Sequence, residues 1–95
     1  MTRRELLSRR AAILALAAQH GARNVRLFGS VARDQATPMS DVDLLVEMGP
    51  NHSPWFPSGL RLDLIELLGV PVEVVTEGML APDIRAHALA QAIPL

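Results

Sequence analysis

The sequence predicts an α+β fold in which a small mixed β-sheet is covered by helices. Three short apolar segments have the residue types of β-strands, at residues 24–28, 41–47 and 70–76. Segments with helical periodicity lie before, between and after these strands. The chain has 95 residues, which is the size of one small domain, so we expect residues 1–95 to fold as a single unit.

The first predicted element is a long amphipathic helix. A capping box formed by Thr2 and Glu5 begins it, and Gly21 is well placed to end it after about five turns. Its arginines form either a nucleic-acid-binding face or a solvated face. The net charge of the chain is −1, which favours the solvated face.

The central part of the chain predicts two strands separated by a turn and a short helix. Strand 24–28 ends at the turn Gly29-Ser30, and residues 31–35 have the pattern of one or two helical turns. Pro38 prevents that helix from continuing. In strand 41–47 apolar and acidic residues then alternate, which places them on opposite faces.

The second half of the chain predicts a long loop, two helices and one strand. Residues 49–59 hold three prolines and two glycines and form the loop. Helix 60–68 has one broad apolar face, and its Asp63 is expected on the opposite, solvated side. Strand 70–76 and an alanine-rich helix over 79–93 complete the chain.

The composition excludes several classes of protein. No segment approaches the roughly 20 apolar residues of a membrane span, so we expect no membrane insertion and a cytoplasmic location. Without cysteine the chain has no disulfide or thiolate metal site. The basic residues are all arginine, which excludes a lysine-dependent phosphate loop. The net charge and the scarcity of aromatic residues argue against direct nucleic-acid binding.

Two aspartates in strand 41–47 suggest a metal site. Asp41 and Asp43 stand at positions i and i+2, so their side chains point to one face with Cα atoms about 6.6 Å apart. Carboxylate oxygens are the ligands that hard divalent cations prefer, and two-metal sites support phosphoryl displacement. A third carboxylate would come from Glu73, which is either a ligand or an outward-facing strand residue. The three histidines are scattered without metal-like spacing, so we expect surface or helix-end roles for them: His20, His52 and His87.

The Gly29-Ser30 turn suggests a phosphate site beside these carboxylates. A glycine at the end of a strand lets the backbone approach a ligand closely. The short helix that follows offers free N–H groups, and the Ser30 hydroxyl adds another hydrogen bond. A Gly-Ser pair alone is a common turn. Its fixed spacing of ten residues from Asp41-Val42-Asp43 makes the combination informative.

The combined motif resembles a known family. Gly29-Ser30, ten residues and then Asp41-x-Asp43 is similar to the signature of the nucleotidyltransferase superfamily that includes polymerase β. Residues 27–33 and 40–46 resemble the minimal nucleotidyltransferase branch, and residues 68–76 resemble the segment that carries its third carboxylate. The resemblance covers nearly the whole chain and implies a palm-like core.

The resemblance also implies a site. It would bind ATP or another NTP with Mg²⁺, two ions being expected, and transfer a nucleoside monophosphate. The implied metal ligands and catalytic residues are Asp41, Asp43 and Glu73. The implied nucleotide-binding residues are Gly29, Ser30, Arg33 and Ser40. An ion pair with a nearby carboxylate remains an equal alternative for Arg33.

The chain departs from the family pattern in two respects. The family's third carboxylate is most often Asp, whereas this chain has Glu73, whose extra methylene group would shift the position of the ligand. The chain also lacks the helical base-binding domain of larger members. We therefore expect a shallow surface for the base and the acceptor, or one supplied by another protein.

Three hypotheses for the function stay open. Members of the minimal branch resemble antitoxins that work beside a helical toxin of the HEPN type. The first hypothesis is an enzyme that moves AMP or another NMP to such a protein partner. The second is a non-catalytic antitoxin subunit that masks its partner by contact and has a vestigial nucleotide site. The third is transfer to a small molecule, which would require the chain to enclose the acceptor by oligomerising.

Overall fold

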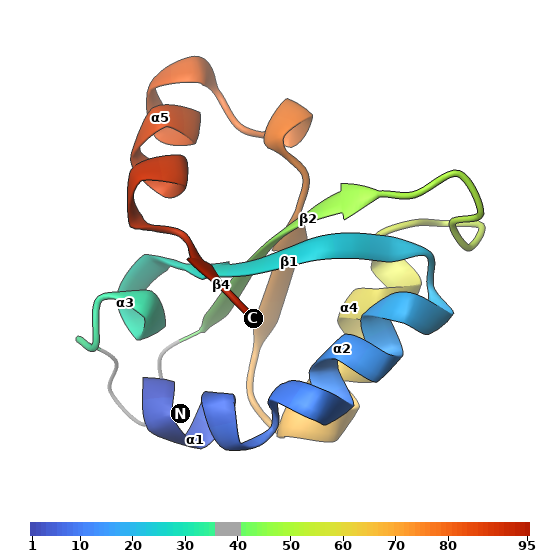
Figure 1. The fold of residues 1–95 in the computed structure, drawn as a ribbon, viewed down its shortest axis with the longest axis horizontal. Helices are drawn as coiled ribbons and strands as arrows, with labels where there is room; N and C mark the ends of the chain where they lie inside the picture. The colour runs from blue at the N-terminus through green and yellow to red at the C-terminus, as the bar shows by residue number, and fades with distance from the viewer. Residues whose placement is uncertain (36–40) are drawn as a thin grey trace.

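The computed structural model describes residues 1–35 and 41–95, which form a mixed four-stranded sheet with helices on both faces (Figure 1). The strands are β1 (Ala22–Phe28), β2 (Val42–Met48), β3 (Val72–Val75) and β4 (Ile93–Pro94). The helices are α1 (Arg3–Ser8), α2 (Arg10–Gln19), α3 (Gly29–Ala32), α4 (Ser58–Leu68) and α5 (Pro82–Gln91), with a 3₁₀ turn η1 (Glu77–Met79). The sheet order is β3-β2-β1-β4, with β1 antiparallel to β2 and β4, and β2 parallel to β3. The predicted α+β class and mixed sheet are confirmed.

The main core lies between the sheet and the helices α1, α2 and α4, which cover one of its faces (Figure 1). Val42, Leu44 and Val46 alternate along β2 and are fully buried in this core together with Ile13 and Leu64. The alternation expected for this strand is therefore confirmed. No helix in the described ranges is long and apolar enough to cross a membrane.

The opposite face of the sheet is covered by η1 and α5 (Figure 1). Arg26 of β1 is buried on this face, and its Nη1 donates to Glu77 Oε1 at 3.3 Å. Arg85 of α5 donates from Nε to the carbonyl oxygen of Glu77 at 2.9 Å. These contacts hold η1 and the start of α5 over the sheet.

The ends of the chain differ from the expectation. The first helix is interrupted at Arg9, whose φ of −102° and ψ of 10° are not helical. The Ser8 hydroxyl donates to the carbonyl oxygen of Glu5 at 2.6 Å and competes locally with the helical pattern. The last helix ends at Gln91, two residues early, because the chain then pairs with β1 as β4. Pro94 fits this edge strand because it lacks an N–H donor.

A histidine ties α2 to the long loop and to α4. The side chain of His20, the residue that ends α2, contacts Ser53 Oγ through Nδ1 at 3.0 Å and Asp63 Oδ2 through Nε2 at 2.7 Å. The helix-end role expected for His20 is confirmed. Asp63 keeps 46% of its side chain exposed, as expected for the solvated side of α4, and its pairing with His20 is a contact that the helical pattern did not predict.

Candidate functional site

The candidate site lies where β1 ends and β2 and β3 begin. Phe28, the last residue of β1, pairs with Asp43 of β2, and Asp43 pairs with Glu73 of β3. Directly opposed residues of neighbouring strands point to the same face of a sheet. The sheet thus brings the Gly29-Ser30 turn and two acidic positions, remote in sequence, to one place.

Gly29 lies directly against the Asp43 side chain. Its φ is +75°, which L side chains rarely adopt. A Cβ atom placed on Gly29 would collide with Asp43 Oδ2 and lie 3.1 Å from its Cγ. The backbone conformation therefore favours glycine at this position, and a side chain there would also push the Asp43 carboxylate aside.

The Asp43 carboxyl lies in a negative environment. Burial raises its pKa above the ordinary value of 3.8, and repulsion from Asp41 and Glu73 raises it further. The positive charge of Arg33 acts in the opposite direction on the same pKa. Carboxylates that repel one another in a partly buried site favour a bound cation.

Glu73 is directed toward an arginine. Arg61 of α4 places Nη2 3.7 Å from Glu73 Oε1, and about half of each side chain is exposed. Arg61 also donates from Nε to the carbonyl oxygen of Val72 at 2.9 Å, which fixes the guanidinium beside β3. Among residues 1–35 and 41–95 no three His, Asp or Glu side chains form a ready cluster for a metal ion.

The expected nucleotide-binding residues have different surroundings. Arg33 donates from Nη1 to Gln91 Oε1 at 3.0 Å and from Nε to Gln35 Oε1 at 3.1 Å, so its hydrogen bonds go to amides. Ser30 is partly buried in the first turn of α3, directly after Gly29. Ser40 lies outside the described residues.

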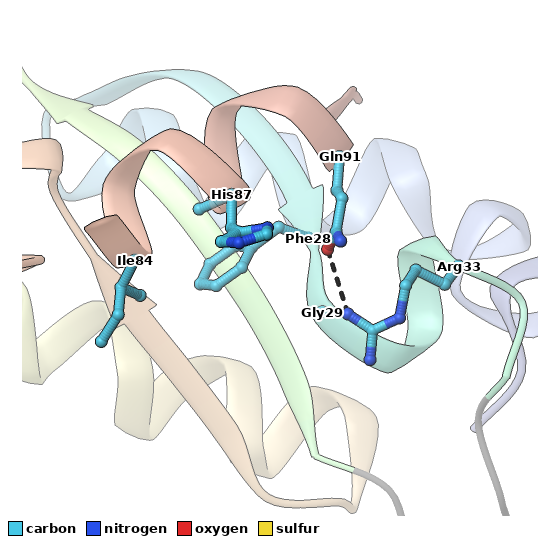
Figure 2. Close-up of a pocket in the computed structure, with 7 residues that line it drawn as sticks. Phe28, Gly29, Arg33, Ile84, His87 and Gln91 are labelled. Atoms are coloured by element: carbon cyan, nitrogen blue, oxygen red, sulfur yellow. Dashed lines mark hydrogen bonds between the residues drawn. The ribbon is translucent and has the colours of Figure 1, made fainter. Parts of the chain in front are cut away.

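A pocket of about 280 Å³ opens between the Gly29 turn and α5 (Figure 2). It is lined by Phe28, Gly29, Arg33, Ile84, His87, Ala88 and Gln91. The four residues of α5 were not among the site residues predicted from the sequence, which predicted a shallow surface for the base or one supplied by another protein. The spacing of positions 84, 87, 88 and 91 marks one face of a helix. It could not show what this face covers, because that depends on how α5 crosses the sheet.

The acidic side chains at this site provide part of the ligand set of a hard divalent cation. Asp41 and Asp43 supply carboxylate oxygens, which are the ligands that Mg²⁺ prefers. Repulsion from Asp41 raises the pKa of Asp43, and a bound cation would relieve this repulsion. Glu73 is close enough to act on the pKa of Asp43, but its ion pair with Arg61 has to open before it can bind a metal ion.

Comparison with known proteins shows the family to which the chain belongs. The nucleotidyltransferase domain family matches residues 10–93. A protein of Methanocaldococcus jannaschii named as a candidate protein adenylyltransferase is 33% identical over 81 residues, which span 85% of this chain and 87% of that protein. A solved structure of a candidate minimal nucleotidyltransferase is 47% identical with a TM-score of 0.86 and covers 100% of this chain and 97% of that one.

A more distant solved structure shares the fold. A toxin–antitoxin complex solved with AMP-PNP contains a chain that is 19% identical to this one, with a TM-score of 0.73 and coverage of 86% of this chain and 68% of that one. The family match, the close structural relative and the juxtaposition of Gly29 with Asp43 point to the same conclusion. The chain belongs to the nucleotidyltransferase family, in its minimal, polymerase β-like branch.

Proposed function

We propose that this chain moves a nucleoside monophosphate, AMP in the first instance, from an NTP to a hydroxyl of a protein partner. The observation that carries the proposal is the packing of the Asp43 carboxylate against Gly29 at the start of α3. This packing puts a metal-binding group beside a turn suited to phosphate. The relative named as a protein adenylyltransferase supports a protein as the acceptor.

The chain's own residues would divide the work. Asp41 and Asp43 would hold Mg²⁺, and Glu73 would complete the ligand set once its ion pair with Arg61 opens. The N–H groups of the turn and the Ser30 hydroxyl hold the triphosphate. Magnesium, when bound, neutralises the phosphate charge and orients the phosphates for in-line displacement.

The reaction is a phosphoryl-group displacement. The acceptor oxygen forms a bond to the α-phosphorus, the bond from that phosphorus to pyrophosphate breaks, and the hydroxyl proton passes to water. Arg33 lies at the edge of the site and would contact the phosphates once it leaves Gln91 and Gln35. Among the described residues Asp41 and Glu73 are exposed, and this open side leaves access for an acceptor from another polypeptide.

The biological setting we propose is a toxin–antitoxin pair, with a helical toxin of the HEPN type as the acceptor. Toxin–antitoxin complexes are among the solved structures that share this fold, which supports the setting. Any small helical protein encoded by a neighbouring gene is the partner to test. A hydroxyl-bearing residue of that protein would receive the AMP.

Label transfer tests the proposal. The partner, Mg²⁺ and ATP labelled at the α-phosphate are incubated with the wild-type chain, which should label the partner. Asp41→Ala combined with Asp43→Ala should reduce the rate at least about 100-fold, since electrostatic groups at the reacting phosphate supply effects of this size. Asp83→Ala is the matched control, because Asp83 is exposed in the first turn of α5. Absence of labelling by the wild type, or equal labelling by the double variant, would contradict the proposal.

A second candidate function is masking of the partner by contact alone. The ion pair between Arg61 and Glu73 favours it, because it occupies the expected third metal ligand. Asp43→Ala separates the two functions when complex formation and toxin neutralisation are both measured. Neutralisation that survives this substitution supports masking, whereas neutralisation lost from an intact complex supports catalysis.

A further inference from the structure

We infer that the pocket between the Gly29 turn and α5 binds the nucleobase end of the NTP and prefers a purine. This inference rests on the proposed function, since it assumes that the triphosphate lies over Gly29 and Asp43. It assigns the pocket to the donor nucleotide and leaves the acceptor on the open side of the site. The residues that would recognise the base are Phe28, Ile84, His87 and Gln91.

The sheet register places the pocket next to the phosphate position. Phe28 and Asp43 are directly paired across β1 and β2, so both side chains project from the face that α5 covers. Gly29 belongs both to the contact with Asp43 and to the pocket lining. A nucleotide whose phosphates lie at Gly29 therefore has its nucleoside within reach of Phe28.

The lining suits a planar heterocycle. Phe28, Ile84 and Ala88 give apolar walls, and His87 and Gln91 add polar groups from the same face of α5 (Figure 2). Stacking of a nucleobase on an aromatic side chain contributes about 1–3 kcal/mol to the binding free energy, whichever base is stacked. The two-ring purines cover more of such a wall than pyrimidines do. Amide and imidazole groups offer hydrogen bonds to the edge of the base.

The size of the pocket fits part of a nucleotide. Its volume of about 280 Å³ lies just below the range for small-molecule sites, roughly 300–1,000 Å³. A base with part of its sugar fills such a space, whereas the triphosphate has to lie outside it, over Gly29 and Asp43. This division matches the positions of the apolar and acidic groups.

Hydrogen bonds hold α5 beside the pocket. Arg33 Nη1 donates to Gln91 Oε1 at 3.0 Å across the pocket, which links the end of α3 to α5 (Figure 2). The bonds of Arg26 and Arg85 to Glu77 hold the other end of this segment. The bonds to Glu77 would keep α5 over Phe28 when Arg33 moves from Gln91 to the phosphates, and this fixed position reduces the ordering cost of binding.

Calorimetric titration with two probes tests the inference. ATP and inorganic tripolyphosphate share the phosphate chain, but only ATP has a base. In Mg²⁺ the wild type should bind ATP more tightly than tripolyphosphate, and ATP more tightly than CTP. Ile84→Ala and His87→Ala should each weaken ATP binding by about 3- to 10-fold and change tripolyphosphate binding by less than about twofold, as expected for partial loss of a stacking wall.

Leu89→Ala is the matched control. Leu89 is 41% exposed on α5 but does not line the pocket, whereas Ile84 is 53% exposed and does. Both residues are on the surface of one helix, so both variants should fold, which circular dichroism checks. Leu89→Ala should keep the wild-type affinity for ATP.

Three outcomes would overturn the inference. Equal affinity of the wild type for ATP and tripolyphosphate would show that the base makes no contact, and would leave the proposed function intact. Unchanged ATP affinity with slower label transfer in Ile84→Ala would assign the pocket to the acceptor. No binding of either probe to the wild type would overturn the proposed function and this inference together.

Discussion

The backbone of Gly29 lies against the carboxylate of Asp43, so closely that a single added methyl group would collide with Oδ2. One residue belongs to the Gly29-Ser30 turn and the other to strand β2. The two halves of the motif are therefore in direct contact through the β1–β2 register. Any ligand held by one half is also adjacent to the other.

Gly29→Ala tests this contact. A side chain at φ +75° costs about 1–2 kcal/mol, and displacement of Asp43 adds to that cost. We expect the free energy of unfolding to fall by about 2 kcal/mol or more in urea titrations, with loss of Mg²⁺-dependent ATP binding. Gly78→Ala is the control, because a Cβ there meets no atom within 4 Å. A Gly29→Ala protein with wild-type stability and ATP affinity would contradict the contact.

Asp43→Asn should stabilise the metal-free chain at pH 7. The pKa of Asp43 is raised by burial and by Asp41 and Glu73, so its charged form costs stability above the folded-state pKa. Because the group is only half-buried, we expect a gain of a few tenths to about 1 kcal/mol. As the pH falls through the raised pKa toward 3.8, wild-type Asp43 takes up its proton and the gain should disappear.

The measurement is thermal unfolding of both proteins between pH 3 and pH 8, with and without Mg²⁺. Magnesium should stabilise the wild type near neutral pH and have little effect on Asp43→Asn. Asp83→Asn serves as the control and should be neutral or slightly destabilising, because it lies in the first turn of α5. A stabilisation by Asp43→Asn that increases as the pH falls would contradict the prediction.

Arg61→Met should strengthen Mg²⁺ binding only slightly. The pair with Glu73 is 3.7 Å long and about half exposed at both side chains, so it contributes at most about 1 kcal/mol. Releasing Glu73 can therefore raise the Mg²⁺ affinity by no more than about fivefold. Arg23→Met, which opens the exposed pair with Glu47, should leave the affinity unchanged. A gain of more than tenfold would mean that Arg61 controls the site.

Glu77→Gln should destabilise the chain more than a typical surface substitution. Arg26 is 9% exposed, and its Nη2 has no hydrogen-bond partner among the described residues, so Glu77 supplies its counter-charge. We expect a loss of about 1–3 kcal/mol in urea unfolding, reduced by the partial exposure of Glu77. Glu47→Gln is the exposed control and should cost less than about 0.5 kcal/mol.

A double variant separates charge from packing at the same position. Arg26→Met combined with Glu77→Gln removes both charges and keeps an unbranched side chain in the buried space. Its stability should return most of the way to that of the wild type, because apolar replacement of a buried pair is often neutral. A double variant as unstable as the sum of its parts would show that Arg26 acts by packing alone.

The sequence by itself determined the class of fold and the central motif. Alternation in β2 placed Val42 and Leu44 in the core, since a strand has a period of two residues and its faces can be read directly. The spacing of Gly29-Ser30 and Asp41-x-Asp43 identified the family, because few residue types can bind phosphate and metal ions. The roles of Asp41, Asp43 and Glu73 as ligands stay predictions.

Tertiary structure decided what no local pattern contains. The pairing of Asp63 with His20, of Glu73 with Arg61 and of Arg33 with Gln91 joins residues on different elements. The short β4 replaced the end of a helix because the edge of β1 was available to it. The pocket over Phe28 exists only because α5 crosses that face of the sheet. These contacts depend on packing between distant segments, so the periodicity of one segment cannot predict them.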